Sequence, residues 1–109
     1  MDFNISAQHT ELTPALEDAV RDKFSRFGEH VGAGHSVHAH VILRIDNGRH
    51  VVEATVTGLG VPLAARSAKD DMYTAINEAS RLIDRQWRKA KTAQLALRRE
   101  GSIKHMNMG

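Results

Sequence analysis

One stretch, residues 70–91, constrains the fold of this chain of 109 residues more than any other. Its apolar residues recur at steps of three and four, which places them in one stripe along a helix with 3.6 residues per turn. The stripe consists of Met72, Ile76, Ala79, Ile83, Trp87 and Ala90. A row of cations, Arg81, Arg85 and Arg88, repeats this spacing on the opposite side. The sequence therefore predicts a helix that buries one face against a second layer and presents guanidinium groups on the other.

Two carboxylates and a glycine indicate where this helix begins and ends. Asp70 and Asp71 stand at its amino-terminal end, where carboxylates accept hydrogen bonds from unpaired backbone N–H groups and complement the helix dipole. Helical composition continues beyond Lys91 and is expected to stop at Gly101, with a frayed polar tail after it. We therefore expect a folded domain in residues 1–91, and a helical extension with a flexible tail in residues 92–109.

A strand and a helix are expected in the first part of the chain. Phe3 and Ile5 alternate with polar residues, which is typical of a strand. Thr13 and Pro14 then form a helix start, because threonine caps the first turn and proline lacks only an N–H group that has no partner there. The buried stripe of this helix is predicted to be Leu16, Val20, Phe24 and Phe27.

Three further strands are expected in residues 36–67. From Ser36 to Ile45, apolar residues alternate with mostly polar ones, so one face of the strand is buried. Asn47 and Gly48 are the pair favoured in a tight hairpin turn, and a returning strand follows in residues 49–57. The last strand is expected in residues 61–67. Pro62 cannot donate a hydrogen bond to a neighbouring strand, which places this strand at an edge or the proline at its start.

The order strand, helix, three strands, helix restricts the topology. A helix between the first two strands predicts a parallel pair with a right-handed crossover, and the last three strands form an antiparallel meander. Because each helix has one apolar stripe and the sheet has one clearly apolar face, both helices must pack on that face. The predicted fold class is α+β, a two-layer β-α-β-β-β-α domain with a four-stranded sheet. Lys23, Arg26 and His30, on one flank of the first helix, then join the arginine row of the second helix in one patch.

Positive charge is concentrated near the carboxyl-terminal end, although the formal net charge is only +2. From Arg81 onward, eight of the 15 Lys and Arg residues stand against two of the 13 acids, Asp84 and Glu100. The eight are Arg81, Arg85, Arg88, Lys89, Lys91, Arg98, Arg99 and Lys104. Such a local concentration favours a polyanionic partner, and the alternative is a solvated helix face.

Composition also indicates a compartment. The chain has no cysteine, which fits a reducing environment. No stretch approaches the roughly 18 apolar residues of a membrane span, and the first residues lack the pattern of a secretory leader. These features predict a cytoplasmic protein without disulfides and without a membrane partner.

Neither a metal site nor an active site stands out. His38 and His40 share one face of a strand, and His35 and His50 could lie near them. Zinc sites take three or four ligands of defined geometry, and no carboxylate or thiol completes this set. The sequence also lacks a nucleophile with a base and a phosphate-binding glycine loop. We therefore expect no metal, no cofactor and no enzymatic activity.

The two aromatic residues of the 70–91 stretch have different expected positions. Trp87 falls on the apolar stripe, so we expect it in the core. Tyr73 falls at the rim of the stripe, where the ring can pack and the hydroxyl can reach water. Its place in the sequence does not by itself indicate stacking on a nucleotide base.

Four segments carry a family resemblance: ELTPAL at residues 11–16, VHAHVIL at 37–43, DMYTAIN at 71–77 and DRQ at 84–86. Through them, residues 1–91 resemble the bacterial ribosome hibernation promoting factors, a family that includes the ribosome-associated inhibitor called protein Y. The β-α-β-β-β-α order expected above agrees with that family. The length of the chain makes it similar to the short members, which lack the carboxyl-terminal dimerisation domain of the long ones.

The resemblance implies binding to the small ribosomal subunit, in the channel for mRNA and for the A-site and P-site tRNAs, and inhibition of translation in idle cells. Basic positions on the two helices contact rRNA phosphates in the family. With the arginine row added, the expected rRNA-binding residues are Lys23, Arg26, Arg81, Arg85, Arg88, Lys89 and Lys91. Many relatives have a basic residue just before the position of Ile83, where this chain has Leu82, and Arg81 stands at a position that is often acidic. Relative to the family pattern, the positive charge is therefore displaced by one position.

The expected partners are small-subunit rRNA and the ribosome, joined by a separate ribosome modulation factor if ribosomes are paired. The free protein is expected to be a monomer. Two alternatives stay open, a protein-binding modulator of transcription and a general binder of double-stranded RNA. The sequence also leaves open whether ribosomes are silenced singly or as dimers.

Overall fold

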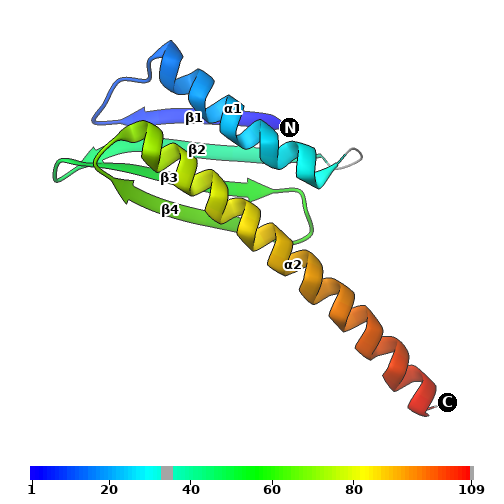
Figure 1. Ribbon diagram of the computed structural model, residues 1–109. Coiled ribbons are helices and arrows are strands. Elements are labelled where there is room, and N and C mark those ends of the chain that lie inside the picture. The colour runs from blue at the N-terminus through cyan, green and yellow to red at the C-terminus, as the bar shows by residue number, and fades with distance from the viewer. Residues whose placement is uncertain (33–35, 109) are drawn as a thin grey trace.

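The computed structural model describes residues 1–32 and 36–108, and the side chains of residues 1–32 and 36–93. Six elements follow one another in the predicted order β-α-β-β-β-α. They are β1 (Asp2–Gln8), α1 (Pro14–Val31), β2 (His38–Asp46), β3 (Arg49–Thr57), β4 (Leu63–Lys69) and α2 (Met72–Met108). The molecule measures 60 × 28 × 17 Å, because α2 continues beyond the sheet (Figure 1).

The four strands form one sheet in the order β1-β2-β3-β4 (Figure 1). β1 and β2 are parallel, with Ile5 opposite Val41, and α1 forms the connection between them. β2 with β3 and β3 with β4 are antiparallel. These pairings confirm the parallel first pair and the antiparallel meander that the sequence predicted.

The turn between β2 and β3 has the chemistry expected of a two-residue hairpin. Asp46 pairs with Arg49, which leaves Asn47 and Gly48 as the loop. Both residues have positive φ, 50° for Asn47 and 75° for Gly48. Asparagine and glycine tolerate this region, and two positive φ angles in succession match the twist of the flanking strands. The turn therefore fixes the register that buries one face of each strand.

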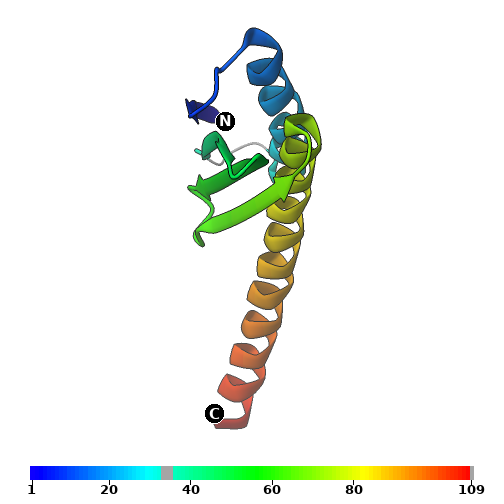
Figure 2. The ribbon, with the colours of Figure 1, turned by 90° about the vertical axis from the view of Figure 1, so that its left-hand side faces the viewer.

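Both helices cover the same face of the sheet, as predicted (Figure 2). The core between the layers contains Val20, Phe24 and Phe27 of α1, Val41 and Leu43 of β2, Val52 and Val56 of β3, and Ile76, Ile83 and Trp87 of α2. Trp87 is 6% exposed, which confirms its predicted place in the core. Leu16 and Ala90 are only partly buried at the margins of their stripes. Because both apolar stripes face inward, the polar flanks of α1 and α2 meet at the surface.

Each helix begins at a side-chain cap. The Leu16 N–H donates a hydrogen bond of 3.2 Å to Thr13 Oγ1, and Pro14 opens the helix. At the start of α2, Asp71 Oδ2 accepts hydrogen bonds of 2.9 Å from both the backbone N–H and the hydroxyl of Thr74. Both predicted caps are therefore confirmed, with Asp71 rather than Asp70 in the capping position.

Several element boundaries differ from the expected ones. β2 begins at His38 and β4 at Leu63, each two residues later than predicted. α2 continues to Met108 and passes through Gly101, so the prediction that it ends at Gly101 is wrong. A single glycine in a helix costs about 1 kcal/mol relative to alanine, which does not by itself end a helix. The division of the chain at residue 91 stays a prediction. Gly109, the last residue of the predicted flexible tail, lies outside the described residues.

Candidate nucleic-acid interface

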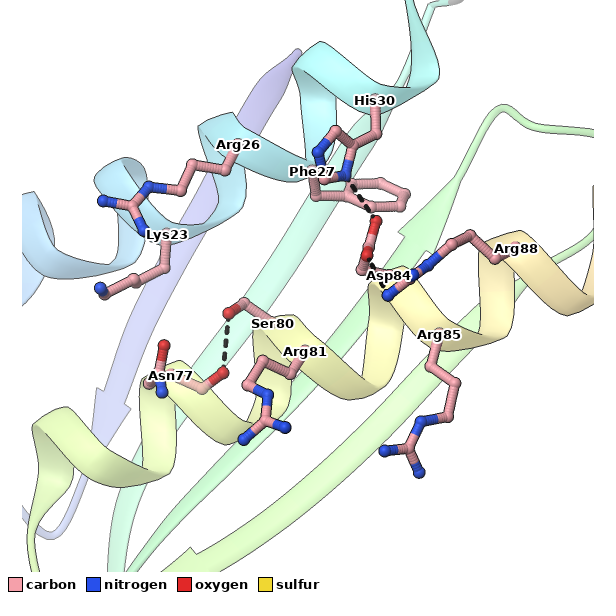
Figure 3. Close-up of a pocket in the computed structure, with 10 residues that line it drawn as sticks. All are labelled: Lys23, Arg26, Phe27, His30, Asn77, Ser80, Arg81, Asp84, Arg85 and Arg88. Carbon is pink, nitrogen blue, oxygen red and sulfur yellow. Dashed lines mark hydrogen bonds and ion pairs between the residues drawn. The ribbon is translucent and has the colours of Figure 1, made fainter.

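α1 and α2 lie side by side and enclose a hollow of about 210 Å³, which we call the interhelical groove (Figure 3). From α1 it is lined by Lys23, Arg26, Phe27 and His30. From α2 it is lined by Asn77, Ser80, Arg81, Asp84, Arg85 and Arg88. Residues from two segments separated by 47 positions in the sequence, from His30 to Asn77, therefore form one surface, which confirms that the two basic clusters meet.

The phase of each helix directs these side chains to the groove. Phe24 and Phe27 are buried against the sheet, so Lys23 and Arg26 lie on the flank of α1 next to them. In α2, Ile83 is buried, and Asp84 follows it on the flank that faces α1. The apolar stripes thus determine which cations line the groove.

Asp84 joins the two helices at one end of the groove (Figure 3). Its Oδ1 lies 2.8 Å from His30 Nδ1 of α1, and its Oδ2 lies 2.8 Å from Arg88 Nη2 of α2. The Asp84 side chain is only 14% exposed, whereas those of His30 and Arg88 are mostly exposed. Asp84 therefore neutralises part of the positive charge at this end and holds Arg88 along the groove wall.

The other cations of the groove are weakly paired or unpaired. Arg26 lies 3.9 Å from Asp22, and Arg81 lies 3.7 Å from Glu78, both as exposed pairs within one helix. Such pairs contribute little to stability and exchange readily with other anions. Among the side chains that the structure describes, Lys23 and Arg85 form no ion pair. These four cations are available to a polyanion.

Five of the seven predicted rRNA-binding residues line the groove. They are Lys23, Arg26, Arg81, Arg85 and Arg88. Lys91 lines an adjoining hollow that shares His30, Asp84 and Arg88 with the groove. Lys89 is exposed but lines neither hollow. Arg81, the position displaced from the family pattern, lines the groove, whereas its neighbour Leu82 is half-buried.

Two residues have roles that sequence reasoning missed. The spacing of Asp84 and Arg88 permits an ion pair within α2, but nothing in the sequence links Asp84 to His30 on the other helix. Gln86 also reaches a distant segment: its Oε1 accepts a hydrogen bond of 3.1 Å from the Ala64 N–H, and its Nε2 donates one of 2.6 Å to the Ala64 carbonyl. Both contacts depend on how the elements pack, which periodicity does not encode.

The arrangement suits binding rather than chemistry. Within the described ranges, no group of three or more His, Asp or Glu side chains could hold a metal ion. His38 lies 3.4 Å from Asp2 on the open face of the sheet, away from the groove. None of the helices in the described part of the chain is long and apolar enough to cross a membrane. What the groove offers a ligand is a set of fixed guanidinium and ammonium groups, which bind phosphate well.

The fold and the groove together define a small two-layer β-α-β-β-β-α domain with cations gathered on the surface between its helices. The sequence matches the sigma 54 modulation protein / S30EA ribosomal protein family over residues 3–94, and the chain belongs to that family. The family consists of ribosome hibernation factors, which bind and do not catalyse, so the resemblance and the expected lack of enzymatic activity are both confirmed. Its members act in ribosome hibernation and the regulation of translation.

Known proteins of this family resemble the chain in sequence and fold. The ribosome hibernation promoting factor of Pseudomonas putida is 36% identical over 97 residues, which cover 89% of this chain and 93% of the relative. The ribosome hibernation promotion factor of Lactococcus lactis is 35% identical, and the match covers 83% of this chain but 49% of the relative. The Thermus thermophilus protein Y N-terminal domain superposes with a TM-score of 0.72 at 23% identity, covering 79% of this chain and 94% of that domain. The last comparison confirms the fold.

Proposed function

We propose that this protein binds the small ribosomal subunit in the channel for mRNA and tRNA, and that it inhibits translation in idle cells by occupying that channel. The observation that carries the proposal is the interhelical groove, where five cations from two helices lie on one surface. The site in the subunit and the inhibition follow from the family resemblance together with this surface.

The physical basis is recognition of rRNA phosphates by fixed cations. Each phosphate that a Lys or Arg side chain neutralises releases condensed counterions, so affinity falls steeply as salt increases. Cations on two packed helices also hold a fixed spacing, which selects the shape of a folded RNA rather than its sequence. Lys23, Arg26, Arg81, Arg85 and Arg88 are the proposed phosphate contacts of the groove. Lys91 extends this surface, and Lys89 is proposed as a contact outside the groove.

The biological setting follows from the proposed partner. A ribosome-binding factor acts in the cytoplasm, where ribosomes are, and we propose that the free protein is a monomer. A separate ribosome modulation factor is the proposed second partner if the bound ribosomes pair. Names among the relatives support this setting, since the Pseudomonas putida protein is a ribosome hibernation promoting factor.

Co-sedimentation with purified small subunits at low salt tests the proposal. The unaltered protein is expected in the subunit fraction, and a clearly smaller share of the double variant Arg81→Gln/Arg85→Gln is expected there at the same salt concentration, because two phosphate contacts are lost. The matched control Arg21→Gln/Arg66→Gln removes the same charge from exposed arginines outside the groove, each of which has an ion pair elsewhere, and should sediment with subunits. An unaltered protein that fails to sediment with subunits would contradict the proposal.

A second candidate function has some support, because the family description also names modulation of sigma 54. A protein partner in transcription would be bound through specific contacts that survive RNase treatment and moderate salt. Pull-down of this protein before and after RNase therefore separates the two functions. A general binder of double-stranded RNA would instead show equal affinity for arbitrary duplexes and for the small subunit.

A further inference from the structure

Tyr73 is exposed in a chain that otherwise uses its aromatic residues in packing. Its side chain is 50% exposed, whereas Phe24, Phe27 and Trp87 are buried. Among the described residues, only Tyr73 and Met1 are large apolar side chains classed as exposed. An exposed apolar side chain by itself is ordinary. The polar and charged residues next to Tyr73 on the helix surface, however, indicate a binding site.

Tyr73, Asn77 and Arg81 follow one another at steps of four along α2. Residues four apart on a helix share a face, with about 5–6 Å between their Cβ atoms. Asn77 and Arg81 line the interhelical groove, so Tyr73 lies one turn before the groove's amino-terminal end. The Asn77 side chain is exposed, and its amide forms no hydrogen bond within the described part of the chain. An aromatic ring, a free amide and a guanidinium therefore stand in a row.

The backbone that carries this row is held in place before any ligand binds. Met72, beside Tyr73, is buried in the core, and Asp71 caps the first turn through Thr74. Ile76 anchors the next turn, since it is fully buried. A ring on a fixed backbone loses little conformational entropy when a ligand stacks on it. The row is thus preorganised for binding.

We propose that Tyr73 and Asn77 form a recognition site for an unpaired RNA base at the amino-terminal end of the interhelical groove. The Tyr73 ring stacks on the face of the base, the Asn77 amide exchanges hydrogen bonds with its edge, and Arg81 holds a neighbouring phosphate. The choice of RNA rests on the proposed function. The inference adds that the RNA must offer a single-stranded nucleotide, because bases inside a duplex have no free face.

The arginines on the open face of the sheet already have an acidic partner. Arg44 and Arg66 both pair with Glu53, at 2.8 and 3.6 Å, so they are less available to phosphate. The Phe3 side chain is partly buried and packs against the core, so its ring is less available for stacking on a ligand. Stacking and phosphate binding therefore come together on the helices.

The test uses Tyr73→Leu, which keeps an apolar side chain but removes the ring, and Tyr73→Phe as its matched control. The probes are small ribosomal subunits, a labelled single-stranded RNA 12-mer of mixed sequence, and the same RNA annealed to its complement. Loss of one stacked base should weaken binding of Tyr73→Leu to the subunits and to the single strand by about tenfold or more. The slope of affinity against salt should not change, because stacking releases no counterions. Tyr73→Phe should bind as the unaltered protein does, and the duplex should not distinguish the three proteins.

Two results would overturn the base site: binding of Tyr73→Leu at the unaltered affinity, or equal weakening by Tyr73→Phe, which would assign the effect to the hydroxyl. If the unaltered protein binds the single strand with the predicted pattern but does not bind subunits, the proposed function fails and the base site stands. If subunits bind all three proteins equally, the base site fails and the proposed function stands.

A measurement without substitution covers the case of a variant that does not fold. The chain has one tyrosine, so incorporation of 3-fluorotyrosine gives a single fluorine resonance. Addition of the single-stranded 12-mer should shift this resonance and addition of the duplex should not. Absence of a shift with the saturating single strand would overturn the proposal.

Discussion

At the scale of single residues, Gly58 shows how one position can admit only one amino acid. It follows β3 with φ at +100°, a region that residues with a side chain rarely adopt. A Cβ atom built at this position would lie 2.0 Å from the Ser36 carbonyl oxygen and 3.2 Å from the Val37 Cα. The chain entering β2 and the chain leaving β3 therefore approach each other so closely at Gly58 that no Cβ atom fits between them.

We predict that Gly58→Ala lowers the free energy of unfolding by at least about 2 kcal/mol, because the strained φ and the backbone clash act together. Gly48→Ala is the matched control: Gly48 also has positive φ, 75°, but an added Cβ would meet no atom within 4 Å. That change should cost only about 1 kcal/mol. Urea unfolding of both variants gives the comparison, and equal losses would show that the contact with Ser36 is unimportant.

Gln86 is a second residue with a defined structural role, because it connects α2 to the edge strand β4. β4 is an edge strand, and the side chain of Gln86 pairs with both the N–H and the carbonyl of Ala64 on it. An edge strand with open backbone groups invites pairing with other chains, so this contact closes part of the edge. The sequence placed this strand at an edge or Pro62 at its start; β4 is at an edge, and Pro62 lies just before its first residue.

Gln86→Met is expected to destabilise the protein by about 1–2 kcal/mol, because it keeps the length of the side chain and removes two hydrogen bonds. The local readout is amide hydrogen exchange, in which the Ala64 N–H should lose protection while the Ala54 N–H in the central strand β3 keeps it. Unchanged protection of Ala64 would mean that the hydrogen bond is not formed in solution.

At the scale of elements, the start of α2 is held by an ionised carboxylate. The hydrogen bonds from the Thr74 N–H and then from its hydroxyl lower the pKa of Asp71 from its ordinary 3.8, and the charge of His50 acts in the same direction. A carboxyl group whose pKa is lowered in the folded state stabilises that state at pH values above the pKa that the group has in the unfolded chain. The contribution is lost as the pH falls through the folded pKa.

Asp71→Asn should therefore be less stable than the unaltered protein at neutral pH, and this difference should shrink as the pH falls below 3.8. Asparagine can also cap a helix, but its side chain does not titrate. Urea unfolding across this pH range measures the difference, and carbon NMR of the Asp71 carboxyl group should show a titration midpoint below 3.8. A midpoint at or above that value would contradict the proposed cap energetics.

At the scale of the whole molecule, the sequence contains most of the architecture and little of the contact between elements. Alternation from residue 38 to 57 and the Asn47-Gly48 turn define the central hairpin, since both depend on neighbours in sequence. The stripe of α2 likewise predicts burial of Ile83 and Trp87. The hydrogen bonds between Gln86 and the backbone of Ala64 join residues 22 positions apart, and they can form only after α2 has packed on the sheet.

Of the candidate site, too, the sequence predicts which residues share a surface but not which of them are paired. Helical spacing brings Arg81, Arg85 and Arg88 together, and the shared face of the sheet predicts that Lys23 and Arg26 lie beside them. The ion pairs of Asp84 with His30 and Arg88 were not foreseen, although they decide which groove cations are free. A charge pattern counts the cations on a surface, whereas only the packed structure shows how many of them already have a partner.

The central claim is that the cations of the interhelical groove bind rRNA phosphates, and the salt dependence of small-subunit binding tests it most directly. The logarithm of affinity for the unaltered protein and for Arg21→Gln/Arg66→Gln should fall along the same steep line as the logarithm of salt concentration increases. For Arg81→Gln/Arg85→Gln the slope should be shallower by roughly 1.4 to 1.8, the contribution of two phosphate contacts. Equal slopes for all three proteins would contradict the claim, because they would show that Arg81 and Arg85 do not contact phosphate.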